Sequence, residues 1–504
     1  MKGKIGFDNE KYLAEQTAAI LERVGTFGGK LYLEFGGKLL FDYHAARVLP
    51  GFDPNVKMRL LQGLKDKADI ILCIYAGDIE RKKVRADFGI TYDTDALKLI
   101  DDFRERGLDI CAVVITRFDD QPAATVFKNR LERQDIRVYT HRAIRGYPAD
   151  INRIVSDEGY GANAYIETKH PLVVMTAPGP GSGKLSTCLS QLYHDYRQGR
   201  KSGYAKFETF PIWSLPLKHP VNVAYEAATA DLRDFNLIDP FHLEAYQKTA
   251  INYNRDVDAF PVVKAIFERI TGAAPYRSPT DMGVNRAGFG IVDNAVVEDA
   301  ARQEVIRRYL RAQCEYALGF TDKGTVDRAH VVMTQLNVGP EHRVVVGSAW
   351  NAAREAQRTG KGNQGIYCGA AIELQNGTIV TGKNSPVMHA AAAVVLNAVK
   401  TVANIPDHIH LLSPSVLESI IRFKRDLANK KSASMDLEDT MIALCISATT
   451  NPTAQMALEK LKDLSGCDMH MTHIPSPGDE VGLRRLGVNL TTDTNFPSKN
   501  LFLT

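Results

Sequence analysis

The residues best suited to chemistry lie in one stretch, residues 172–188, with the sequence LVVMTAPGPGSGKLSTC. An apolar run is followed by a glycine-rich turn, a lysine and two hydroxyl residues, and then by an amphipathic segment. Glycines adopt positive φ angles easily, so several backbone N–H groups can converge on one anion. The start of a following helix adds a partial positive charge. This order of strand, loop and helix is typical of sites that hold nucleotide phosphates.

The loop departs at two positions from the common phosphate-loop pattern G-x-x-x-x-G-K-[ST]. Pro178 replaces the first glycine, and Leu185 replaces the hydroxyl residue that contacts Mg²⁺. The loop resembles that of nucleotide kinases such as adenylate kinases, in which the hydroxyl residue also follows the lysine by two positions. The resemblance implies that ATP and Mg²⁺ bind here. The residues expected to bind the phosphates and the ion are Gly179, Gly181, Ser182, Gly183, Lys184, Ser186 and Thr187.

Phosphoryl transfer also needs charged groups beside the phosphates. Lys184 is the first catalytic candidate, because its ammonium would neutralise charge on the transferred group. Arg255, in the segment Asn-Tyr-Asn-Arg-Asp, and Asp281, in the segment Ser-Pro-Thr-Asp-Met-Gly, are the other two. The aromatic loop around Phe210 and Trp213 is expected to hold the second substrate.

A carboxylate at a strand end would hold the metal ion of such a site. Asp78 and Asp119 each follow an apolar run, so they are candidates for this role. The alternative is that both are ordinary turn or helix-cap residues. A basic cluster would either reach the phosphates or form a solvated helix face, and it consists of Arg81, Lys82, Lys83 and Arg85.

The elements around the loop follow an alternating pattern. Apolar runs rich in β-branched residues alternate with amphipathic segments from about residue 30 to residue 210. This pattern predicts a parallel sheet with helices on both faces, with the loop after the fifth strand. A repeated Phe-Gly-Gly-Lys, beginning at residues 27 and 35, is interpreted as the two turns of a hairpin. The expected strands are 30–35, 69–75, 109–116, 136–139, 172–176 and 204–207, and the clearest helices are 54–67, 93–106 and 122–133.

The length of 504 residues suits about three domains in an α/β multidomain protein. Residues 1–275 are expected to form the α/β phosphate-loop domain, within which residues 209–274 are rich in Pro, Asn and aromatics and are expected to be irregular. Residues 276–340 are expected to form a helical region, and residues 341–504 a second α/β domain.

The second α/β domain carries a hairpin signal. Residues 365–384 contain two apolar runs joined at Asn376-Gly377, and an apolar helical segment follows at residues 388–402. The run resembles the core of cytidine deaminases, in which two such strands and a helix carry a zinc site.

The zinc chemistry of deaminases does not carry over. A deaminase needs a His-Ala-Glu or Cys-Ala-Glu motif and a Pro-Cys-x-x-Cys motif. Here Ala391 replaces the glutamate, Ser415 and Glu418 replace the cysteines, and His389 is the remaining ligand. We therefore expect no zinc, no deaminase activity, and a domain used for packing, assembly or ligand binding.

Composition excludes several classes of protein. The 62 Lys and Arg residues nearly balance the 59 Asp and Glu residues, and this net charge of +3 argues against nucleic acid or a membrane surface as a partner. The seven cysteines show no Cys-x-x-Cys pair, and no 18-residue apolar stretch is present. These features favour a cytoplasmic protein. No His-Glu-x-x-His motif supports a peptidase.

Four motifs together resemble one uncharacterised bacterial protein family of about 500 residues, a domain of unknown function sometimes labelled ATP-dependent peptidase without support. The motifs are LYLEFGGK at 31–38, KVRAD at 83–87, APGPGSGK at 177–184 and FETFPIW at 207–213. The resemblance implies a cytoplasmic protein and supplies no catalytic residues.

Two functions remain open from the sequence. The first is a nucleotide-binding protein of phosphotransferase type that uses the loop at residues 177–184. The second is a non-catalytic assembly or ligand-sensing protein, in which the loop is structural and the deaminase-like region joins copies into a homo-oligomer.

Overall fold

The structure is a computed structural model that describes residues 4–85, 89–426 and 433–498. The side chain of Arg85, one of the basic candidates, lies outside the described part. The chain divides into two compact units, residues 5–301 and residues 302–504. Among the helices in the described ranges, none is long and apolar enough to cross a membrane.

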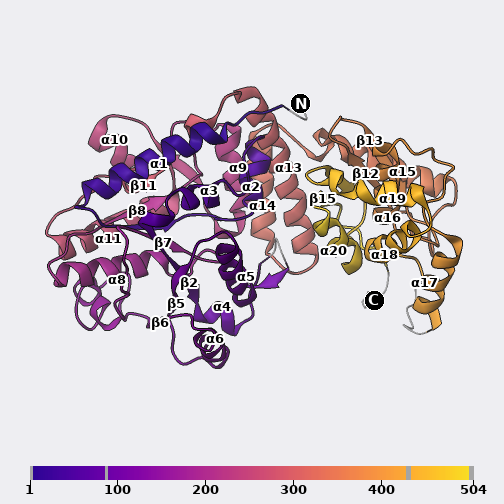
Figure 1. The fold of residues 1–504 in the computed structure, drawn as a ribbon. Helices are drawn as coiled ribbons and strands as arrows, with labels where there is room; N and C mark the ends of the chain where they lie inside the picture. Colours follow the sequence, from indigo (N-terminus) through magenta and orange to yellow (C-terminus); the bar gives the residue numbers. More distant parts are fainter. Residues whose placement is uncertain (1–3, 86–88, 427–432, 499–504) are drawn as a thin grey trace. The chain divides into compact units, whose positions relative to one another are not determined.

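In the first unit, the described residues form a sheet of seven parallel strands in the order β11–β8–β1–β7–β2–β5–β6 (Figure 1). Most of the strands are apolar and largely buried on both faces, as is typical of a parallel sheet covered by helices, whereas the edge strand β6 is half-buried. The six expected strands are all present, and the predicted parallel sheet is confirmed. The strands are β1 (Leu31–Phe35), β2 (Ala68–Tyr75), β5 (Ile110–Thr116), β6 (Val138–His141), β7 (Leu172–Thr176), β8 (Gly203–Phe207) and β11 (Gly283–Val284).

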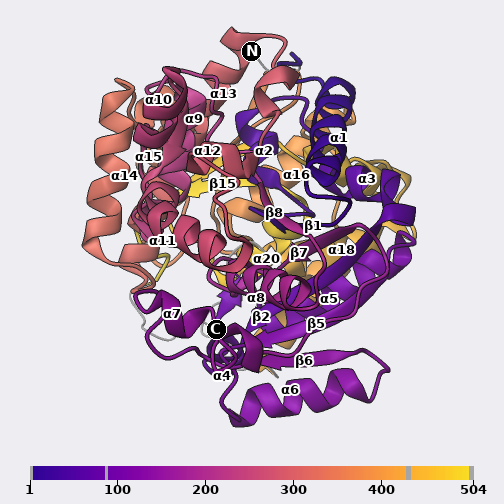
Figure 2. The same cartoon turned by 90° about the vertical axis from the view of Figure 1, so that its left-hand side faces the viewer.

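Helices cover both faces of this sheet. Apolar residues of α8 and α11 pack against one face, in a cluster that includes Tyr32, Val173 and Tyr204, while α5 packs on the other face (Figure 2). The helices of this unit are α1 (Asn9–Thr26), α2 (Tyr43–Val48), α3 (Val56–Gly63), α4 (Ala76–Glu80), α5 (Tyr92–Glu105), α6 (Pro122–Glu132), α7 (Ile151–Ile154), α8 (Lys184–Arg197), α9 (Pro220–Ala228), α10 (Pro240–Tyr246), α11 (Asn254–Thr271), α12 (Pro279–Met282) and the start of α13 (Asn294–Ala317).

The strand order places the loop of residues 177–183 at a switch point of the sheet. The connections from β1 to β2, β5 and β6 run toward one edge, whereas the connection from β7 to β8 runs back past β1. Because such crossovers are right-handed, α8 lies on the face opposite α5. Ligands of open α/β sheets bind beyond the carboxyl ends of the strands at such a reversal. The loop after β7 therefore lies where this fold class binds ligands.

Two expectations about the first unit are wrong. The repeated Phe-Gly-Gly-Lys does not form a hairpin, because β1 pairs in parallel with both β7 and β8. Residues 209–274 are largely regular, since α9, α10 and α11 lie within them. The short strands of this unit form two antiparallel pairs, β3 (Val84–Arg85) with β4 (Ile90–Thr91) and β9 (Asn236–Ile238) with β10 (Ile251–Tyr253).

The described part of the second unit contains a separate mixed sheet in the order β13–β12–β14–β15. The predicted hairpin is confirmed, and Gly377 in its turn has a φ of 83°. The predicted helix after the hairpin and the helical segments before it are also present. The elements are α14 (Lys323–Gln335), α15 (Val344–Arg358), β12 (Gly369–Glu373), β13 (Ile379–Lys383), α16 (Ala390–Val402), α17 (Pro414–Asp426), α18 (Leu437–Ala448), α19 (Pro452–Glu459), β14 (Asp468–Met471), α20 (Pro477–Arg485) and β15 (Asn489–Thr492).

Candidate functional site

The loop between β7 and α8 depends on two glycines in the left-handed region. Gly181 has a φ of 72°, and Gly183, the residue that precedes α8, has a φ of 87°. Residues with a Cβ atom rarely adopt such angles, so the glycines are required by the path of the chain. Gly179 is required for another reason, because an added Cβ would lie 2.5 Å from the hydroxyl oxygen of Tyr92.

The carbonyl groups of this loop are held by side chains. Thr116 Oγ1, at the end of β5, donates to the carbonyl of Ser182 at 2.7 Å, and Arg117 donates to the carbonyl of Gly181. Ser182 Oγ donates to the carbonyl of Gly179, and Thr187 Oγ1 donates to that of Gly183 at 3.0 Å. The loop is thus fixed through its acceptors.

The N–H groups of the same loop are not engaged in this way. In the ranges that the structure describes, the N–H groups of Gly181, Ser182, Gly183 and Lys184 donate to no protein acceptor. Backbone N–H groups are almost always paired with some partner. A run of unengaged donors beside a helix start is an arrangement that suits an anion.

Lys184 begins α8, and its side chain points toward β1. The ammonium Nζ lies 3.9 Å from Oε1 of Glu34, and each side chain is only 12% exposed. Glu34 also accepts a hydrogen bond from the hydroxyl of Tyr204 at 2.9 Å. The carboxylate of Glu34 therefore holds the ammonium of Lys184 beside the loop.

Glu34 also lies beside a cluster of charged side chains at the ends of the strands. Glu34 is the register partner of Lys206 on β8, and Lys206 Nζ lies 2.9 Å from Oε1 of Glu208. Lys206 also pairs with Asp256 at the start of α11 and donates to the hydroxyl of Tyr253. Burial lowers the pKa of Lys206, but Asp256 and Glu208 more than offset this and hold that pKa well above its usual value. Lys206 therefore stays charged.

Glu208 is a deeply buried carboxyl of this group. It directly follows β8 and is 4% exposed. Burial raises the pKa of Glu208 to about 7, Lys206 opposes the rise, and Asp256 adds to it. A carboxyl group with a pKa near neutrality exchanges protons readily at physiological pH, which suits general base catalysis.

The raised pKa of Glu208 predicts a pH-dependent stability. The folded chain binds this proton more tightly than the unfolded chain, so the free energy of unfolding should fall as pH rises from 4.5 to about 7. The loss through Glu208 should be on the order of 3 kcal/mol. Glu208→Gln should lack this slope, so its stability relative to wild type should improve as pH rises. Urea unfolding at several pH values measures this, and parallel curves for the two proteins would contradict it.

Arg255 and Asp281, the other catalytic candidates, have partners outside the loop. Arg255 pairs with the buried carboxylate of Asp234 at 2.9 Å. It is the neighbour of Asp256 and so lies beside the charged group of β8. Asp281 precedes β11, and its side chain accepts hydrogen bonds from the hydroxyl of Tyr246 at 2.8 Å and from the N–H of Arg277 at 3.1 Å. Among the described residues, its hydrogen bonds do not involve the loop.

The candidate metal carboxylates are also placed differently from one another. Asp78, at the start of α4, is 2% exposed and pairs with Arg81 and, at 3.9 Å, with Lys83. It therefore neutralises part of the basic cluster. Asp119 lies in an exposed turn, in which its N–H donates to the side chain of Gln121 at 2.8 Å.

The aromatic residues expected to hold a second substrate divide into two environments. Phe210 is buried, and its ring stacks on Tyr225 at a centroid distance of 6.4 Å. Trp213 is half-buried, and its Nε1–H has no acceptor in the described part of the chain. An added Cβ on Gly283 would lie 2.4 Å from the indole ring and 3.3 Å from Glu208 Oε2, so the indole and the carboxylate share one neighbour.

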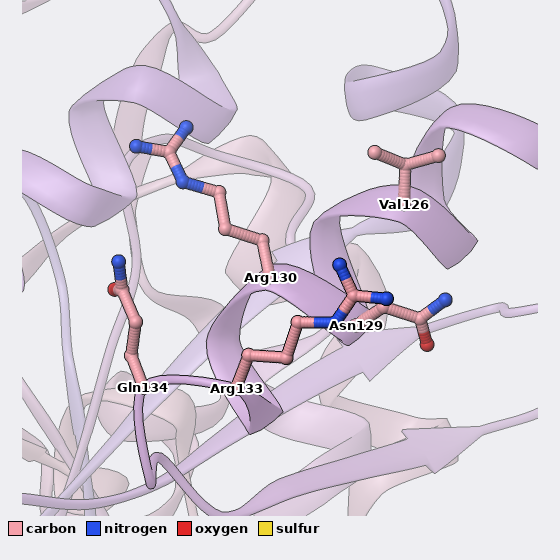
Figure 3. A pocket seen from close by; sticks show the side chains of 5 residues that line it. All are labelled: Val126, Asn129, Arg130, Arg133 and Gln134. Carbon is pink, nitrogen blue, oxygen red and sulfur yellow. The ribbon is translucent and has the colours of Figure 1, made fainter.

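An open hollow of about 500 Å³ lies on α6 and the turn that follows it, and Figure 3 shows the side chains that line it. Its residues include none of the sequence-predicted site residues. They are Val126, Asn129, Arg130, Arg133 and Gln134.

In the second unit, His389 precedes α16 but meets α20 rather than α17. Its Nδ1 lies 2.7 Å from Oδ2 of Asp479, which also accepts from Ser476 Oγ at 2.8 Å. Burial opposes protonation of His389, but Asp479 outweighs it and raises the pKa of the imidazole. Ser415 and Glu418 lie at the start of α17. In the described ranges, no three His, Cys, Asp or Glu side chains are grouped to hold a metal ion.

Comparison with known proteins identifies the family. Residues 5–337 match the family described as "Domain of unknown function DUF1846, N-terminal", and residues 341–502 match "Domain of unknown function DUF1846, C-terminal". The chain belongs to this family. A UPF0371 protein of Clostridium tetani (strain Massachusetts / E88) is 56% identical over 500 residues, which cover 99% of each chain. A UPF0371 protein of Clostridium botulinum (strain Langeland / NCTC 10281 / Type F) is 56% identical over 501 residues, again 99% of each chain.

These matches confirm the expected membership in an uncharacterised family of about this length. The names of the DUF1846 family and of the two clostridial relatives state no ligand, reaction or partner. The chemistry of the chain must therefore be argued from its own residues.

Sequence reasoning missed several residues that contact or flank the loop. Glu34 had a signal, since it is a charged residue inside a buried apolar strand that is followed by Gly36-Gly37. Glu208 also had one, since it directly follows residues 204–207, the last strand that the sequence predicts for this sheet. Thr116 and Arg117 had none, because only the placement of β5 brings them to a loop more than 60 positions later.

Proposed function

We propose that this protein binds the phosphates of a nucleotide, with ATP as the probe of choice, at the loop between β7 and α8, and that it transfers a phosphoryl group. The observation that carries the proposal is the asymmetry of the loop. Its carbonyls accept hydrogen bonds from protein side chains, whereas the N–H groups of residues 181–184 donate to no acceptor in the described chain.

Lys184 would supply the charge that these N–H groups lack. Dipole effects at a helix start contribute only about 0.3–1 kcal/mol, so an ammonium must provide much of the affinity for a polyanion. Lys184 lies at the first position of α8, and its partner Glu34 is at 3.9 Å, which is longer than a direct hydrogen bond. The ammonium can therefore turn from this carboxylate to a phosphate.

Mg²⁺ would accompany the nucleotide and neutralise charge on its phosphates. This ion is usually held by one or two protein groups together with phosphate oxygens and water. Of the two hydroxyl candidates, Thr187 is buried and donates to Gly183, whereas Ser186 is half-buried. Ser186 is thus the hydroxyl that fits this role better.

Glu208 would serve the acceptor side of the reaction. Its carboxylate would take the proton of an acceptor hydroxyl while that oxygen forms the new bond to phosphorus. The bond from this phosphorus to the bridging oxygen of the leaving diphosphate would break at the same time. The half-buried Trp213, which shares the neighbour Gly283 with Glu208, offers an apolar surface and one N–H donor for the acceptor.

The proposal predicts a thermal shift with nucleotide. Mg-ATP at 100 times its Kd should stabilise the folded chain by about 2.7 kcal/mol and raise its Tm by several degrees. Adenosine at the same concentration is the matched control, because it keeps the base and ribose but has no phosphate. An unchanged Tm with Mg-ATP, or equal shifts with both ligands, would refute the proposed function.

A further inference from the structure

Arg117 is placed unusually for a residue at a strand end. It directly follows β5 and has a φ of 49°, an angle that residues other than glycine rarely adopt. Its guanidinium donates to the carbonyl of Gly181, the central glycine of the loop. This bond uses one of the five N–H groups of a guanidinium, so donors remain for a ligand.

The position of the Arg117 guanidinium is set by an aromatic ring. Its central carbon lies 3.4 Å from the centroid of the Tyr75 ring, at the end of β2. An added Cβ on Gly77 would lie 2.5 Å from this ring, so the ring packs closely against the backbone of α4. A cation stacked on a ring that is itself held in place is oriented before any ligand arrives.

Arg117 also differs from the neighbouring basic residues in its charge balance. Arg81 and Lys83 share the buried carboxylate of Asp78. Within the described ranges, Arg117 makes no ion pair with a carboxylate, and its guanidinium interacts with the carbonyl of Gly181 and the ring of Tyr75. Its positive charge is therefore not compensated at the loop.

Arg117 and Lys184 approach the loop from opposite sides of β7. Lys184 faces Glu34 on β1, which is one neighbour of β7 in the sheet. Arg117 follows β5, which lies beyond β2, the other neighbour of β7. Two positive side chains thus flank the row of unengaged N–H groups. Lys184 already has the carboxylate of Glu34 beside it, so a single phosphate bound next to Lys184 would leave Arg117 without an anionic partner. A chain of linked phosphates that extends toward β5 would supply that partner.

We propose that Arg117 is a second phosphate-binding cation of this loop and that the site takes a ligand with at least two linked phosphates. The inference rests on the proposed function, since it assumes that the loop N–H groups bind phosphate. The inference goes beyond that function because it assigns to Arg117 a preference for ligands with two or more linked phosphates.

Calorimetric titration of the full chain with ATP, ADP and AMP, each with Mg²⁺, tests the inference, because these ligands differ only in phosphate number. Arg117→Ala should weaken the binding of ATP and ADP about tenfold or more and that of AMP less than threefold. Arg117→Lys should recover part of the loss. Arg81→Ala is the matched control, since Arg81 lies over the same Tyr75 ring but pairs with Asp78, and it should change each affinity less than twofold.

The outcomes separate the inference from the function on which it rests. If Arg117→Ala weakens ATP and AMP equally, the residue only supports the loop and the inference fails. It also fails if Arg117→Ala leaves all affinities unchanged while Lys184→Ala abolishes binding, although the proposed function then stands. If the wild-type chain binds none of the three ligands, the proposed function itself fails.

Discussion

Replacing Lys184 with alanine is expected to weaken the binding of Mg-ATP about 10- to 100-fold, because a hydrogen bond to a charged group contributes about 1.5–3 kcal/mol. The ammonium begins α8, beside the N–H groups of Gly181 to Gly183 that have no acceptor in the described chain. The fold should tolerate the change, since the 3.9 Å contact with Glu34 is long for an ion pair. Calorimetry with Mg-ATP measures the effect, and circular dichroism checks the fold.

A charge-matched control and an opposite variant sharpen the Lys184 test. Lys201→Ala removes the same charge at an exposed position between α8 and β8 and should leave the Kd for Mg-ATP unchanged. Glu34→Gln removes the carboxylate that attracts Lys184 and repels phosphate, so it should tighten binding severalfold at low salt. A Lys184→Ala variant that binds Mg-ATP as tightly as wild type would rule out the loop as a phosphate site.

The sheet was largely predictable from the sequence, but its strand order was not. Continuous apolar runs such as residues 69–75 and 109–116 are typical of strands in a parallel sheet that helices cover on both faces. The positions of these strands in the sequence are therefore predictable from the apolar runs. The position of β7 between β1 and β2 cannot be predicted from the hydrophobic periodicity of the sequence. The same limit explains the wrong hairpin. Both Gly28 and Gly37 have positive φ angles, but Gly28 lies in the turn that ends α1, and Gly37 lies in the segment that leads from β1 toward the parallel strand β2.

The error at residues 209–274 had a local cause. The prolines in this segment predict irregular structure, yet Pro220 and Pro240 occupy the first positions of α9 and α10. Proline is favoured at this position, since its missing N–H would be unpaired in any case. The preceding Asp239 accepts from the N–H of His242 at 3.1 Å, which is a typical start of a helix.

The candidate site also consists of residues that the sequence predicts and residues that it does not. Residues 179–187 are contiguous, so their glycines, lysine and hydroxyls indicate a loop by spacing alone. Residues next to other strands reach the site only because of the order of the strands in the sheet. The spacing of residues in the sequence does not show whether a polar residue lies before or after its strand. Glu208 follows β8 as the loop follows β7, whereas Asp281 precedes β11. In a parallel sheet only the groups that follow strands share the carboxyl edge.

Gly183→Ala is expected to damage the loop far more than Gly181→Ala. Both glycines have positive φ angles, which cost an alanine about 1–2 kcal/mol. At Gly181 no atom lies within 4 Å of an added Cβ, so this cost is the whole effect. At Gly183 the added Cβ would lie 2.9 Å from both Oγ1 and Cγ2 of Thr116, which adds about 1–3 kcal/mol of overpacking. Urea unfolding should therefore show a clearly larger loss for Gly183→Ala.

The Gly183 contact also couples stability to binding. Thr116 donates to the carbonyl of Ser182, so displacing its hydroxyl would release the turn that aims the loop N–H groups. Gly183→Ala should accordingly weaken Mg-ATP binding more than tenfold, while Gly181→Ala should keep most of the affinity. Thr116→Ala removes the two nearest atoms and leaves the Thr116 Cβ at 3.0 Å, so the contact is relieved in part. The double variant should therefore lose about 0.5–1 kcal/mol less stability than the sum of the single variants. Additive losses would mean that the added methyl group does not meet Thr116.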